Sequence, residues 1–503
     1  MNQLKAGAAL NYVIITLNTL VSIAYTPYML RCLGQNEYGL YSLVSSVIAY
    51  LTILDFGFGN AIIRYTSRLK SQGKTTEQWE LFGMFLIIYT IIGLLAMCGG
   101  FSLYYNVDFL FNRTMTIYEI SQARTMMILL TLNLAVTFPL SIFGAIISAY
   151  ENFVFQRIVS ICRILLCTGV MIGLLSIGYK AIALVAVNTV FNIVTLLINV
   201  IYCIFRLRIK IHFARFNWSF LREIVIYSFW IFLNAIMDKI YWGTGQFVLG
   251  AVSGTVAVAV FSVAIMLQQM YMQFSTSISG VLLPRLTAMV SMNKSPKEIS
   301  DLFIKTGRLQ CIIMAFVLSG FIIFGHPFID LWAGKSYGES FVITLIFFIA
   351  LFTPLIQNIG IIILQARNQM KFRSILYVAI SLVSLGAQIW LAKIFGAIGC
   401  ALSIGGALII GQGIIMNIYY KHKQQLEIYI FWKEILKMLI APTILTFAGY
   451  VAVQVFRVTD IFTLIVEILL FSLIYIPFIW RFSMNSYERQ LFSTPIKKIL
   501  HRV

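Results

Sequence analysis

Charged residues are scarce in this protein. Only 11% of its 503 residues are charged, whereas 60% are hydrophobic and 15% are aromatic. The core of a soluble protein of this size does not need so much apolar surface, and recurring runs of about 20 apolar residues have the length that crosses a bilayer. The composition therefore argues against a soluble enzyme or binding protein and indicates a chain surrounded largely by lipid.

Side chains that bind metals or carry redox chemistry are also few. The four histidines are isolated from one another and form no ligand cluster, so no metal site is expected. The seven cysteines are scattered without a C-x-x-C pair, and we expect them to pack as small apolar side chains. No ATP-binding P-loop is expected, because Ile329 stands where the motif before Gly334-Lys335-Ser336 requires a glycine. We therefore expect no cofactor, and transport that is downhill or coupled to an ion.

Apolar stretches long enough to cross a membrane recur along the whole chain, and they predict an all-α polytopic membrane protein with about fourteen transmembrane helices. The first stretch lacks a small-residue cleavage site, so we expect an anchor and not a removable signal peptide. The predicted spans are residues 6–30, 40–62, 81–105, 125–148, 155–177, 181–205, 223–250, 256–283, 302–324, 340–364, 374–395, 398–420, 432–454 and 461–480.

Positive charge is distributed unevenly among the predicted linkers. The formal net charge is +19, from 37 lysines and arginines against 18 acidic residues. If the N-terminus is inside, 28 of the 37 basic residues lie in inside segments, 7 lie outside, and Arg163 and Lys239 lie within spans. This asymmetry follows the positive-inside rule and predicts that both termini are cytoplasmic. The basic charge therefore reports topology and contact with anionic lipids, and nucleic acid is not an expected partner.

The two halves of the chain resemble each other, which predicts an internal repeat. Two offsets align them, and the change between them needs about four extra residues in the first half's outside loop near 106–124. The matched positions at an offset of 220 are Gly34 with Gly254, Tyr41-Ser42 with Phe261-Ser262, and Lys74 with Lys294; those at 216 are Gly144 with Gly360, Asn152 with Asn368, Arg157 with Arg373, and Ala181-Ile182 with Ala397-Ile398.

Each copy of the repeat contains six predicted spans. An even number of spans returns the chain to the same side, so both copies enter the membrane in the same orientation. We therefore expect two six-helix bundles related by a pseudo-two-fold axis along the membrane normal, residues 1–212 and 213–425. Residues 426–503 form an appended helix pair with a basic cytoplasmic tail. Such twin bundles bind substrate between the halves and alternate between inward-open and outward-open states.

The stretch 55–60 (DFGFGN) contains a carboxylate and two glycines inside a predicted span. In the repeat it aligns with 275–280 (STSISG), so small residues recur although the charge does not. Small residues allow helices to approach closely or to unwind locally at membrane depth. We therefore interpret Gly57 and Gly59 as architectural, and Asp55 as the feature without a counterpart.

Segments 34–44 (GQNEYGLYSLV) and 54–64 (LDFGFGNAIIR) resemble the polysaccharide transporter family. These are Wzx-type flippases of the superfamily that also contains MATE drug exporters and lipid II flippases. The resemblance is most specific over residues 1–75, and the segment 330–340 (DLWAGKSYGES) is similar to a further feature of the family. Few functional residues carry over, because the family has no universal catalytic motif.

The resemblance implies a MATE-like fold and a function. The expected substrate is an undecaprenyl-pyrophosphate-linked oligosaccharide, such as an O-antigen or capsule repeat unit. It would be flipped from the cytoplasmic to the outer leaflet of the bacterial inner membrane. The expected partners are this substrate, membrane lipids and other membrane proteins of polysaccharide assembly. Cationic residues in a central cavity would meet the pyrophosphate-sugar.

Segment 227–250 places two charges near the middle of a predicted span. The side chains of adjacent helical residues point about 100° apart, so Asp238 and Lys239 do not pair directly. At helical spacing, Asp238 shares a face with Asn234 and Trp242, while Lys239 shares another with Trp242 and Gln246. Such charges either face a cavity or pair with a neighbouring helix. In a cavity, Lys239 would meet a phosphate, Trp242 would stack on a sugar, and Asp238 would carry a coupling proton or sodium ion.

Four further polar residues are candidates for the same pathway. Asn18 aligns with Asp238 at the offset of 220. Asp55 is a second ion-coupling candidate, with the alternative that it pairs with a basic residue of another helix. Gln357 and Asn358 follow a proline, and they would bind a sugar, satisfy freed carbonyls or hold helices together.

For two other charged residues within predicted spans, the sequence does not decide between a functional and a structural role. Arg163 lies about two turns inside its span, and we expect its side chain to extend toward the cytoplasmic interface. Glu467 lies in the appended pair, away from the expected pathway, and a structural role is expected.

Two other functions compete with the flippase. A MATE-type drug or cation antiporter is the closer alternative, although such exporters usually have twelve helices. A membrane enzyme, such as a polysaccharide polymerase or an O-antigen ligase, needs an outside loop with titratable groups. The longest predicted outside linker, residues 106–124, has Arg113 in its middle and no histidine. We therefore expect a transporter and no enzymatic activity.

Overall fold

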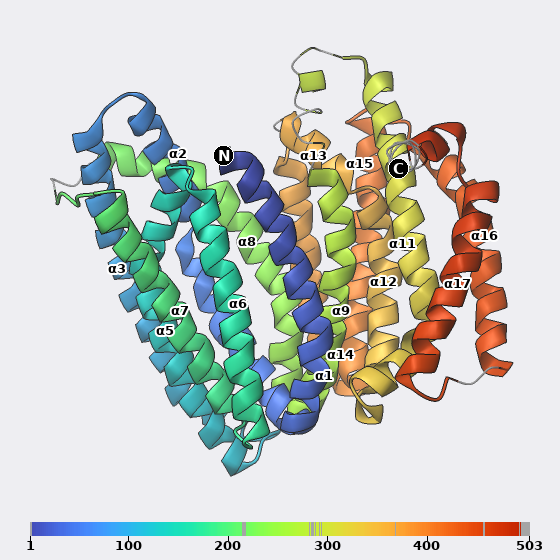
Figure 1. The fold of residues 1–503 in the computed structure, drawn as a ribbon, viewed down its shortest axis with the longest axis horizontal. Helices are drawn as coiled ribbons and strands as arrows, with labels where there is room; N and C mark the ends of the chain where they lie inside the picture. The colour runs from blue at the N-terminus through green and yellow to red at the C-terminus, as the bar shows by residue number, and fades with distance from the viewer. Residues whose placement is uncertain are drawn as a thin grey trace, which may run out of the picture. The chain divides into compact units, whose positions relative to one another are not determined.

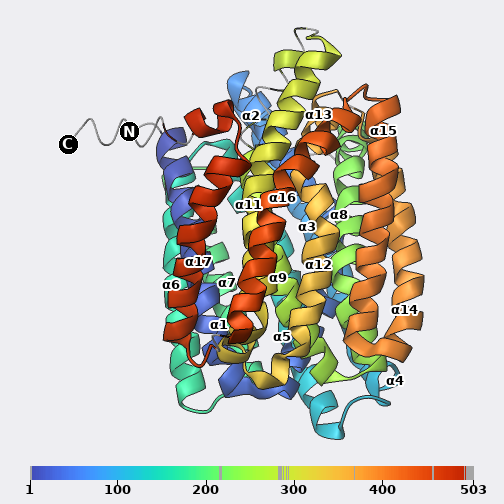
Figure 2. The same ribbon diagram turned by 90° about the vertical axis from the view of Figure 1, so that its right-hand side faces the viewer.

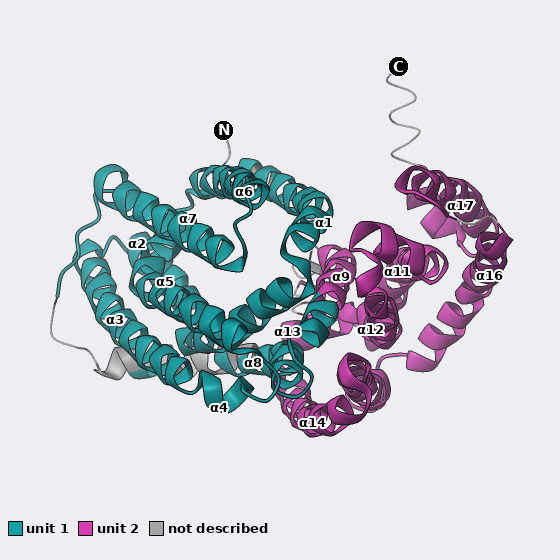
Figure 3. Ribbon diagram, turned by 90° about the horizontal axis from the view of Figure 1, so that it is seen from below, with its two compact units in different colours: residues 1–262 teal, residues 263–503 magenta. Residues whose placement is uncertain are grey.

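The structure is a computed structural model in which the described residues form helices and no strands (Figure 1). It describes residues 3–213, 218–280, 294–367, 369–455 and 458–491, together with 282, 286, 288–290, 292 and 493. By contact the chain divides into two compact units, unit 1 (residues 1–262) and unit 2 (residues 263–503), shown in Figure 3. The predicted repeat boundaries near 212 and 425 concern sequence similarity, and they stay predictions.

Unit 1 is built around one long helix, α5, which contacts α1, α2, α3, α6 and α7 (Figure 3). Helices α3 and α5 approach closely because α3 has glycines at the contact: a Cβ on Gly93 would lie 2.7 Å from the Ala135 carbonyl oxygen. The elements of unit 1 are α1 (Gln3–Leu51), η1 (Thr52–Asp55), α2 (Phe58–Ser71), α3 (Thr75–Tyr105), α4 (Val107–Phe111), α5 (Ile117–Ala149), α6 (Phe153–Ser176), α7 (Ala181–Ile201), η2 (Tyr202–Arg206), α8 (Trp218–Val252) and the first residues of α9 (Thr255–Gly280).

Unit 2 is organised around α11, which contacts α12, α16 and α17. Figure 2 shows the last two helices, α16 and α17, beside it. The elements of unit 2 that follow α9 are α11 (Pro296–Trp332), η3 (Lys335–Tyr337), α12 (Glu339–Ile356), α13 (Asn358–Ala366), α14 (Lys371–Leu408), η4 (Ile409–Ile415), α15 (Met416–His422), α16 (Ile428–Val455) and α17 (Ile461–Phe482).

Glycines in the left-handed region mark the ends of predicted spans. Gly34 has φ 73° and turns the chain within α1, at the gap between the predicted spans 6–30 and 40–62. Gly254, its partner at the offset of 220, has φ 85° in the turn between α8 and α9. A residue with a Cβ is strained at such angles, which explains why glycine occupies both corners. The repeat therefore pairs two positions with the same backbone role.

The described residues contain eleven helical stretches that are long and apolar enough to cross a membrane. Two of them, Ala9–Ser71 and Lys371–His422, each contain two predicted spans. In the second, Gly396 with φ 56° lies between the predicted spans 374–395 and 398–420. The protein is thus an all-α, multi-pass membrane protein, as predicted from composition, while the number of about fourteen spans stays a prediction.

Candidate functional site

The helix is broken where the stretch 55–60 crosses the membrane. Helix α1 tightens into the 3₁₀ turn η1 and ends at Asp55; the next two residues are left-handed, Phe56 with φ 51° and Gly57 with φ 71°. Helix α2 then begins at Phe58. This confirms the predicted local unwinding for Gly57. Gly59, by contrast, lies inside α2, where an added Cβ would meet its nearest neighbour, the Tyr89 hydroxyl, at an ordinary distance of 3.9 Å.

Asp55 at this break is held by a tyrosine from another helix. The hydroxyl of Tyr89 in α3 donates to Oδ1 of Asp55 at 2.7 Å, and Tyr89 itself is only 1% exposed. Asp55 forms no salt bridge with any residue in the described part of the chain. The predicted alternative of a basic packing partner is therefore not what the described residues show. Hydrogen bonds to a charged acceptor are the stronger kind, so Tyr89 both orients and stabilises the carboxylate.

Helix α8 runs alongside this break. The rings of Phe56 and Phe232 lie 4.5 Å apart between centroids, and the hydroxyls of Tyr50 and Thr244 share a 2.7 Å hydrogen bond. Residue 50 pairs with residue 244, and residue 56 pairs with residue 232. The end of α1 with η1 and helix α8 therefore run antiparallel. The charged pair at 238–239 lies between these two contacts, at the level of the turn η1 that precedes the helix break.

The candidate residues of α8 differ in their surroundings. Asp238 is exposed, while Lys239 and Trp242 are half-buried. Lys239 has no hydrogen bond or ion pair with any other residue that the structure describes. The amide of Gln246 instead donates to Ser262 Oγ at 2.8 Å, which joins α8 to α9 inside unit 1. The side chain of Asn234 lies outside the described residues. Lys239 is therefore a half-buried cation of the predicted span 223–250 without an ion-pair partner in the described part of the chain.

A cavity of about 570 Å³ with both polar and apolar lining residues lies between α1, α6 and α7. The predicted Asn18 is one of its lining residues, and so is Arg163, which sequence reasoning left open. Arg163 is half-buried and forms no hydrogen bond or ion pair within the described part of the chain. None of the described residues that line the cavity is acidic. Arg163 thus belongs to a cavity wall, and no described residue of that wall compensates its charge.

Two of the cavity's polar side chains illustrate how its wall is built. Asn188 of α7 donates from Nδ2 to the Tyr41 hydroxyl of α1 at 3.4 Å, which connects the two helices. The hydroxyl of Tyr25 is buried and has no hydrogen-bond partner among the described residues. A buried polar atom without a partner costs free energy, so a ligand or water that accepts this hydrogen bond would be stabilised there.

In unit 2 the predicted amides hold helices together. The amides of Gln357 and Asn417 pair reciprocally, at 2.8 Å and 3.1 Å, and the Trp432 indole donates to Asn417 Oδ1 at 2.9 Å. Asn358 donates from Nδ2 to Ser279 Oγ at 2.7 Å. The helix is interrupted here, since α12 ends before Gln357 and α13 begins after it. The structure therefore shows both amides bonded to neighbouring helices, and a role in binding sugar stays a prediction.

The small-residue run of the second half behaves differently from the first. Residues 275–280 continue α9 as regular helix, whereas the aligned DFGFGN stretch is unwound. Ser275 donates from Oγ to the Leu355 carbonyl at 2.6 Å, and the Gln310 amide donates to Ser275 Oγ at 3.0 Å. The serines thus contribute hydrogen bonds between α9, α11 and α12, where the glycines of the first half allow a turn.

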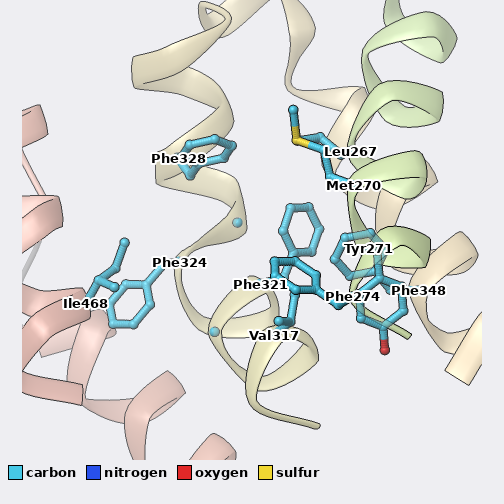
Figure 4. Close-up of a pocket in the computed structure, with 12 residues that line it drawn as sticks. Leu267, Met270, Tyr271, Phe274, Val317, Phe321, Phe324, Phe328, Phe348 and Ile468 are labelled. Atoms are coloured by element: carbon cyan, nitrogen blue, oxygen red, sulfur yellow. The ribbon is translucent and has the colours of Figure 1, made fainter. Parts of the chain in front are cut away.

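An apolar pocket of about 230 Å³ lies between α9, α11, α12 and α17 within unit 2 (Figure 4). The rings of Tyr271 and Phe348 stack with centroids 4.1 Å apart, and Phe321 lies 4.8 Å from Phe348. Ile468 of α17 contributes to the opposite wall (Figure 4). The Tyr271 hydroxyl is already used, donating to the Met314 carbonyl at 3.3 Å. This pocket fits hydrocarbon and offers little to a sugar or phosphate.

Comparison with known proteins places the chain in a family. The sequence model of the polysaccharide biosynthesis protein family matches residues 28–342, more than half of the chain. A curated protein of Shigella flexneri named putative O-antigen transporter is 20% identical over 411 residues, which cover 80% of this chain and 94% of that relative.

Solved structures share the fold. A structure described as the lipid II flippase MurJ in an inward closed conformation is similar with a TM-score of 0.72 at 16% identity, covering 97% of this chain and 99% of that one. An inward-facing MATE family multidrug transporter has a TM-score of 0.61 at 14% identity, covering 83% and 95%. At such identities these likenesses show the fold alone, which is the MATE-like fold that the resemblance predicted. The family match goes further: this chain belongs to the polysaccharide biosynthesis protein family, in keeping with the resemblance that its glycine and tyrosine motifs carry.

Proposed function

We propose that this protein is a flippase for a lipid-linked oligosaccharide. The substrate would be an undecaprenyl-pyrophosphate-linked O-antigen or capsule repeat unit, moved from the cytoplasmic to the outer leaflet of the bacterial inner membrane. The family match supports this proposal, as do the curated relative named putative O-antigen transporter and the fold shared with a lipid II flippase. Both termini would lie in the cytoplasm, in keeping with the positive-inside rule.

The observation that carries the mechanism is the half-buried Lys239 in α8, beside the broken helix at Asp55. An ionisable group in a membrane span is costly, and such groups cluster on substrate and ion pathways. Lys239 has no partner in the described part of the chain, so its ammonium would attract the substrate's phosphate as a point charge. Trp242, three residues on, would stack on a sugar ring.

The two carboxylates near the break are the proposed coupling sites. Asp55 accepts a hydrogen bond from Tyr89, and Asp238 is exposed on α8. Either one would take up a proton or a sodium ion in one state of the transport cycle and release it in the other. The backbone break next to Asp55 supports this assignment, because unwound segments in transporters line ion and substrate sites.

Alternating access would bring substrate past these groups without catalysis. The proposal makes the protein a transporter and not an enzyme, with the substrate, membrane lipids and other membrane proteins of polysaccharide assembly as its partners. Asn18, Gln246, Gln357 and Asn358 stay candidates for sugar contacts. For the last three, substrate would have to exchange with hydrogen bonds that the structure assigns to protein groups.

A MATE-type drug or cation antiporter is the second candidate, favoured by the fold shared with a multidrug transporter at a TM-score of 0.61. The two functions differ in what Lys239 does. A cationic drug would be repelled by an ammonium in its path, whereas a pyrophosphate would be attracted.

Lys239 variants test the proposal in cells. In a strain that needs this protein for surface polysaccharide, Lys239→Ala should abolish the polysaccharide at normal protein level, and Lys239→Arg should restore part of it. Lys305→Ala removes a cation elsewhere in the chain and serves as the control. Full polysaccharide in Lys239→Ala would remove Lys239 from the substrate site.

A further inference from the structure

We propose that the cavity between α1, α6 and α7 binds the phosphate-bearing headgroup of a membrane lipid, with Arg163 as the anchoring cation. The cavity belongs to unit 1 alone, and its walls come from three membrane helices. Its volume of about 570 Å³ lies within the range of small-molecule sites, about 300–1,000 Å³. The site does not include Lys239 and does not depend on the protein being a flippase, although Asn18, a candidate for sugar contacts, is one of its lining residues.

The first argument is charge. Arg163 lies in α6, a helix whose apolar window is largely unburied by the protein. A guanidinium at membrane depth is unfavourable unless an anion, a polar cavity or water compensates it. No residue in the described part of the chain forms an ion pair with Arg163, and none of the described lining residues is a carboxylate. The described wall of the cavity therefore carries a positive charge that an anionic ligand would neutralise.

The second argument is depth. Arg163 is ten residues beyond Phe153, the first residue of α6, so it lies about 15 Å along the helix axis from that end. Arg163 therefore lies inside the helix and nearer to its first residue than to its last. A lipid headgroup that enters the cavity from the leaflet at that end would reach it. A soluble anion would have to cross the same distance without a hydrocarbon anchor.

The third argument is the set of hydrogen-bonding groups. The Tyr25 hydroxyl is buried, lines the cavity and has no partner among the described residues. Asn18 of α1 and Thr168 of α6 also line it, and neither side chain has a hydrogen bond that the structure records among the described residues. A guanidinium binds phosphate oxygens in a fork geometry, and neighbouring hydroxyl and amide groups donate to the remaining oxygens. The cavity thus matches a phosphate ester with polar substituents.

Native mass spectrometry of the full-length protein tests the proposal. The purified protein would be titrated with four lipids: undecaprenyl phosphate, phosphatidylglycerol, and the uncharged undecaprenol and diacylglycerol. Wild type should retain a phosphate-bearing lipid at least tenfold more tightly than its uncharged counterpart. Arg163→Gln should remove that difference, and Arg163→Lys should keep part of it because the charge remains while the fork is lost.

The matched control is Arg157→Gln. Arg157 is a cation six residues earlier in the same helix and does not line the cavity, so its loss should leave the preference unchanged. Tyr25→Phe removes one hydroxyl while retaining the ring, and it should weaken binding of the phosphate-bearing lipid about threefold or more. This second variant keeps the test decisive if Arg163→Gln does not fold, as judged by thermal unfolding without added lipid.

The outcomes separate the two sources of the headgroup. Preference for undecaprenyl phosphate alone would identify the prenyl-linked substrate, and equal preference for phosphatidylglycerol would identify a general phospholipid site. Equal retention of charged and uncharged lipids by wild type would overturn the proposal, as would an unchanged preference in folded Arg163→Gln and Tyr25→Phe. A protein that fails to flip yet shows the Arg163-dependent preference would refute the flippase and leave this site standing.

Discussion

Arg308, which lies within α11, forms a buried ion pair with Glu488. The guanidinium donates from Nε to Glu488 Oε1 at 2.5 Å and from a terminal nitrogen to Oε2 at 3.0 Å, while the two side chains are 6% and 1% exposed. The other donors of Arg308 reach Glu434 of α16 at 3.0 Å and the Ser483 carbonyl after α17 at 3.1 Å. One arginine therefore joins α11, α16 and the segment that follows α17.

Removing one partner of this pair should destabilise the protein strongly. Arg308→Ala leaves the Glu488 carboxylate buried without its cation, and losses of about 3–5 kcal/mol are typical of such a change. Lys437→Ala, which removes an exposed cation 3.9 Å from Glu434, should cost at most about 1 kcal/mol. Denaturant unfolding in detergent measures both. Equal small effects would show that Arg308 does not hold the appended helices.

The helix break should respond differently to alanine at its two glycines. Gly57 has φ 71°, so Gly57→Ala forces a Cβ into the left-handed region at a cost of about 1–2 kcal/mol. Gly59 lies inside α2 with no neighbour closer than 3.9 Å to an added Cβ, so Gly59→Ala should be neutral or stabilising by up to about 1 kcal/mol. Thermal unfolding of the two variants compares them directly. A Gly57→Ala protein as stable as Gly59→Ala would contradict the unwound backbone.

The hydrogen bond between Tyr89 and Asp55 should contribute to stability. Tyr89→Phe removes the hydroxyl and leaves Asp55 short of a donor, which costs about 1–3 kcal/mol. Tyr105→Phe, on the same helix, changes a ring that is 76% exposed and should have no measurable effect. The free energy of unfolding of each variant tests this, and in an Asp55→Asn background the effect of Tyr89→Phe should shrink. An undiminished effect there would mean that Tyr89 acts through another group.

The role of Asp55 in ion coupling gives a separate prediction. If Asp55 carries the coupling ion, Asp55→Asn should remove the stimulation of transport by an imposed ion gradient while slow downhill movement of substrate remains. Glu467→Gln, in the appended helix pair, should keep the stimulation. Flux assays in liposomes with and without a gradient distinguish the two. A gradient response equal to that of wild type in Asp55→Asn would assign the coupling elsewhere, with Asp238 the next candidate.

The amide pair of Gln357 and Asn417 should act as a unit. Gln357 is buried and Asn417 is half-buried, and each amide is left partly unsatisfied when the other is removed. Gln357→Leu and Asn417→Leu should therefore each lower stability by about 1–3 kcal/mol. The double variant should lose less than the sum, because neither unpaired amide remains. A strictly additive loss would contradict the pairing. Substrate affinity that falls with no loss of stability would instead favour a sugar-binding role for Gln357.

The helices were predictable from the sequence because a single physical requirement determines them. Backbone groups in lipid must bond within a helix, so apolar runs of sufficient length predict helical spans with little ambiguity. The unwinding at Gly57 was also within reach, since a carboxylate and two closely spaced glycines interrupt an apolar run in residues 55–60. The turns at Gly34 and Gly396 lie between spans that the sequence had already separated, whereas the total of about fourteen spans stays a prediction.

The partners of polar residues could not be read from the sequence. Tyr89 lies thirty-four residues from Asp55 and occurs in an ordinary aromatic-rich helix, so no local pattern connects the two. The sequence predicted Arg308 to be one of the 28 basic residues in inside segments. The structure instead buries it against Glu488, 180 residues away. Arg163 appeared to be a cation that extends to the interface, and its cavity depends on how three helices meet. Such pairings are properties of packing, and they leave no periodicity in the chain.

Leaflet accessibility is the most direct test of the central claim. The purified protein would be placed in liposomes containing undecaprenyl-pyrophosphate oligosaccharide, and an impermeant glycan-modifying enzyme would be added outside. The flippase account predicts that wild type exposes the inner pool to the enzyme, that empty liposomes do not, and that Lys239→Ala exposes it at a much lower rate. Folded wild-type protein that leaves the inner pool of its cognate glycan protected would contradict the account and favour the drug antiporter.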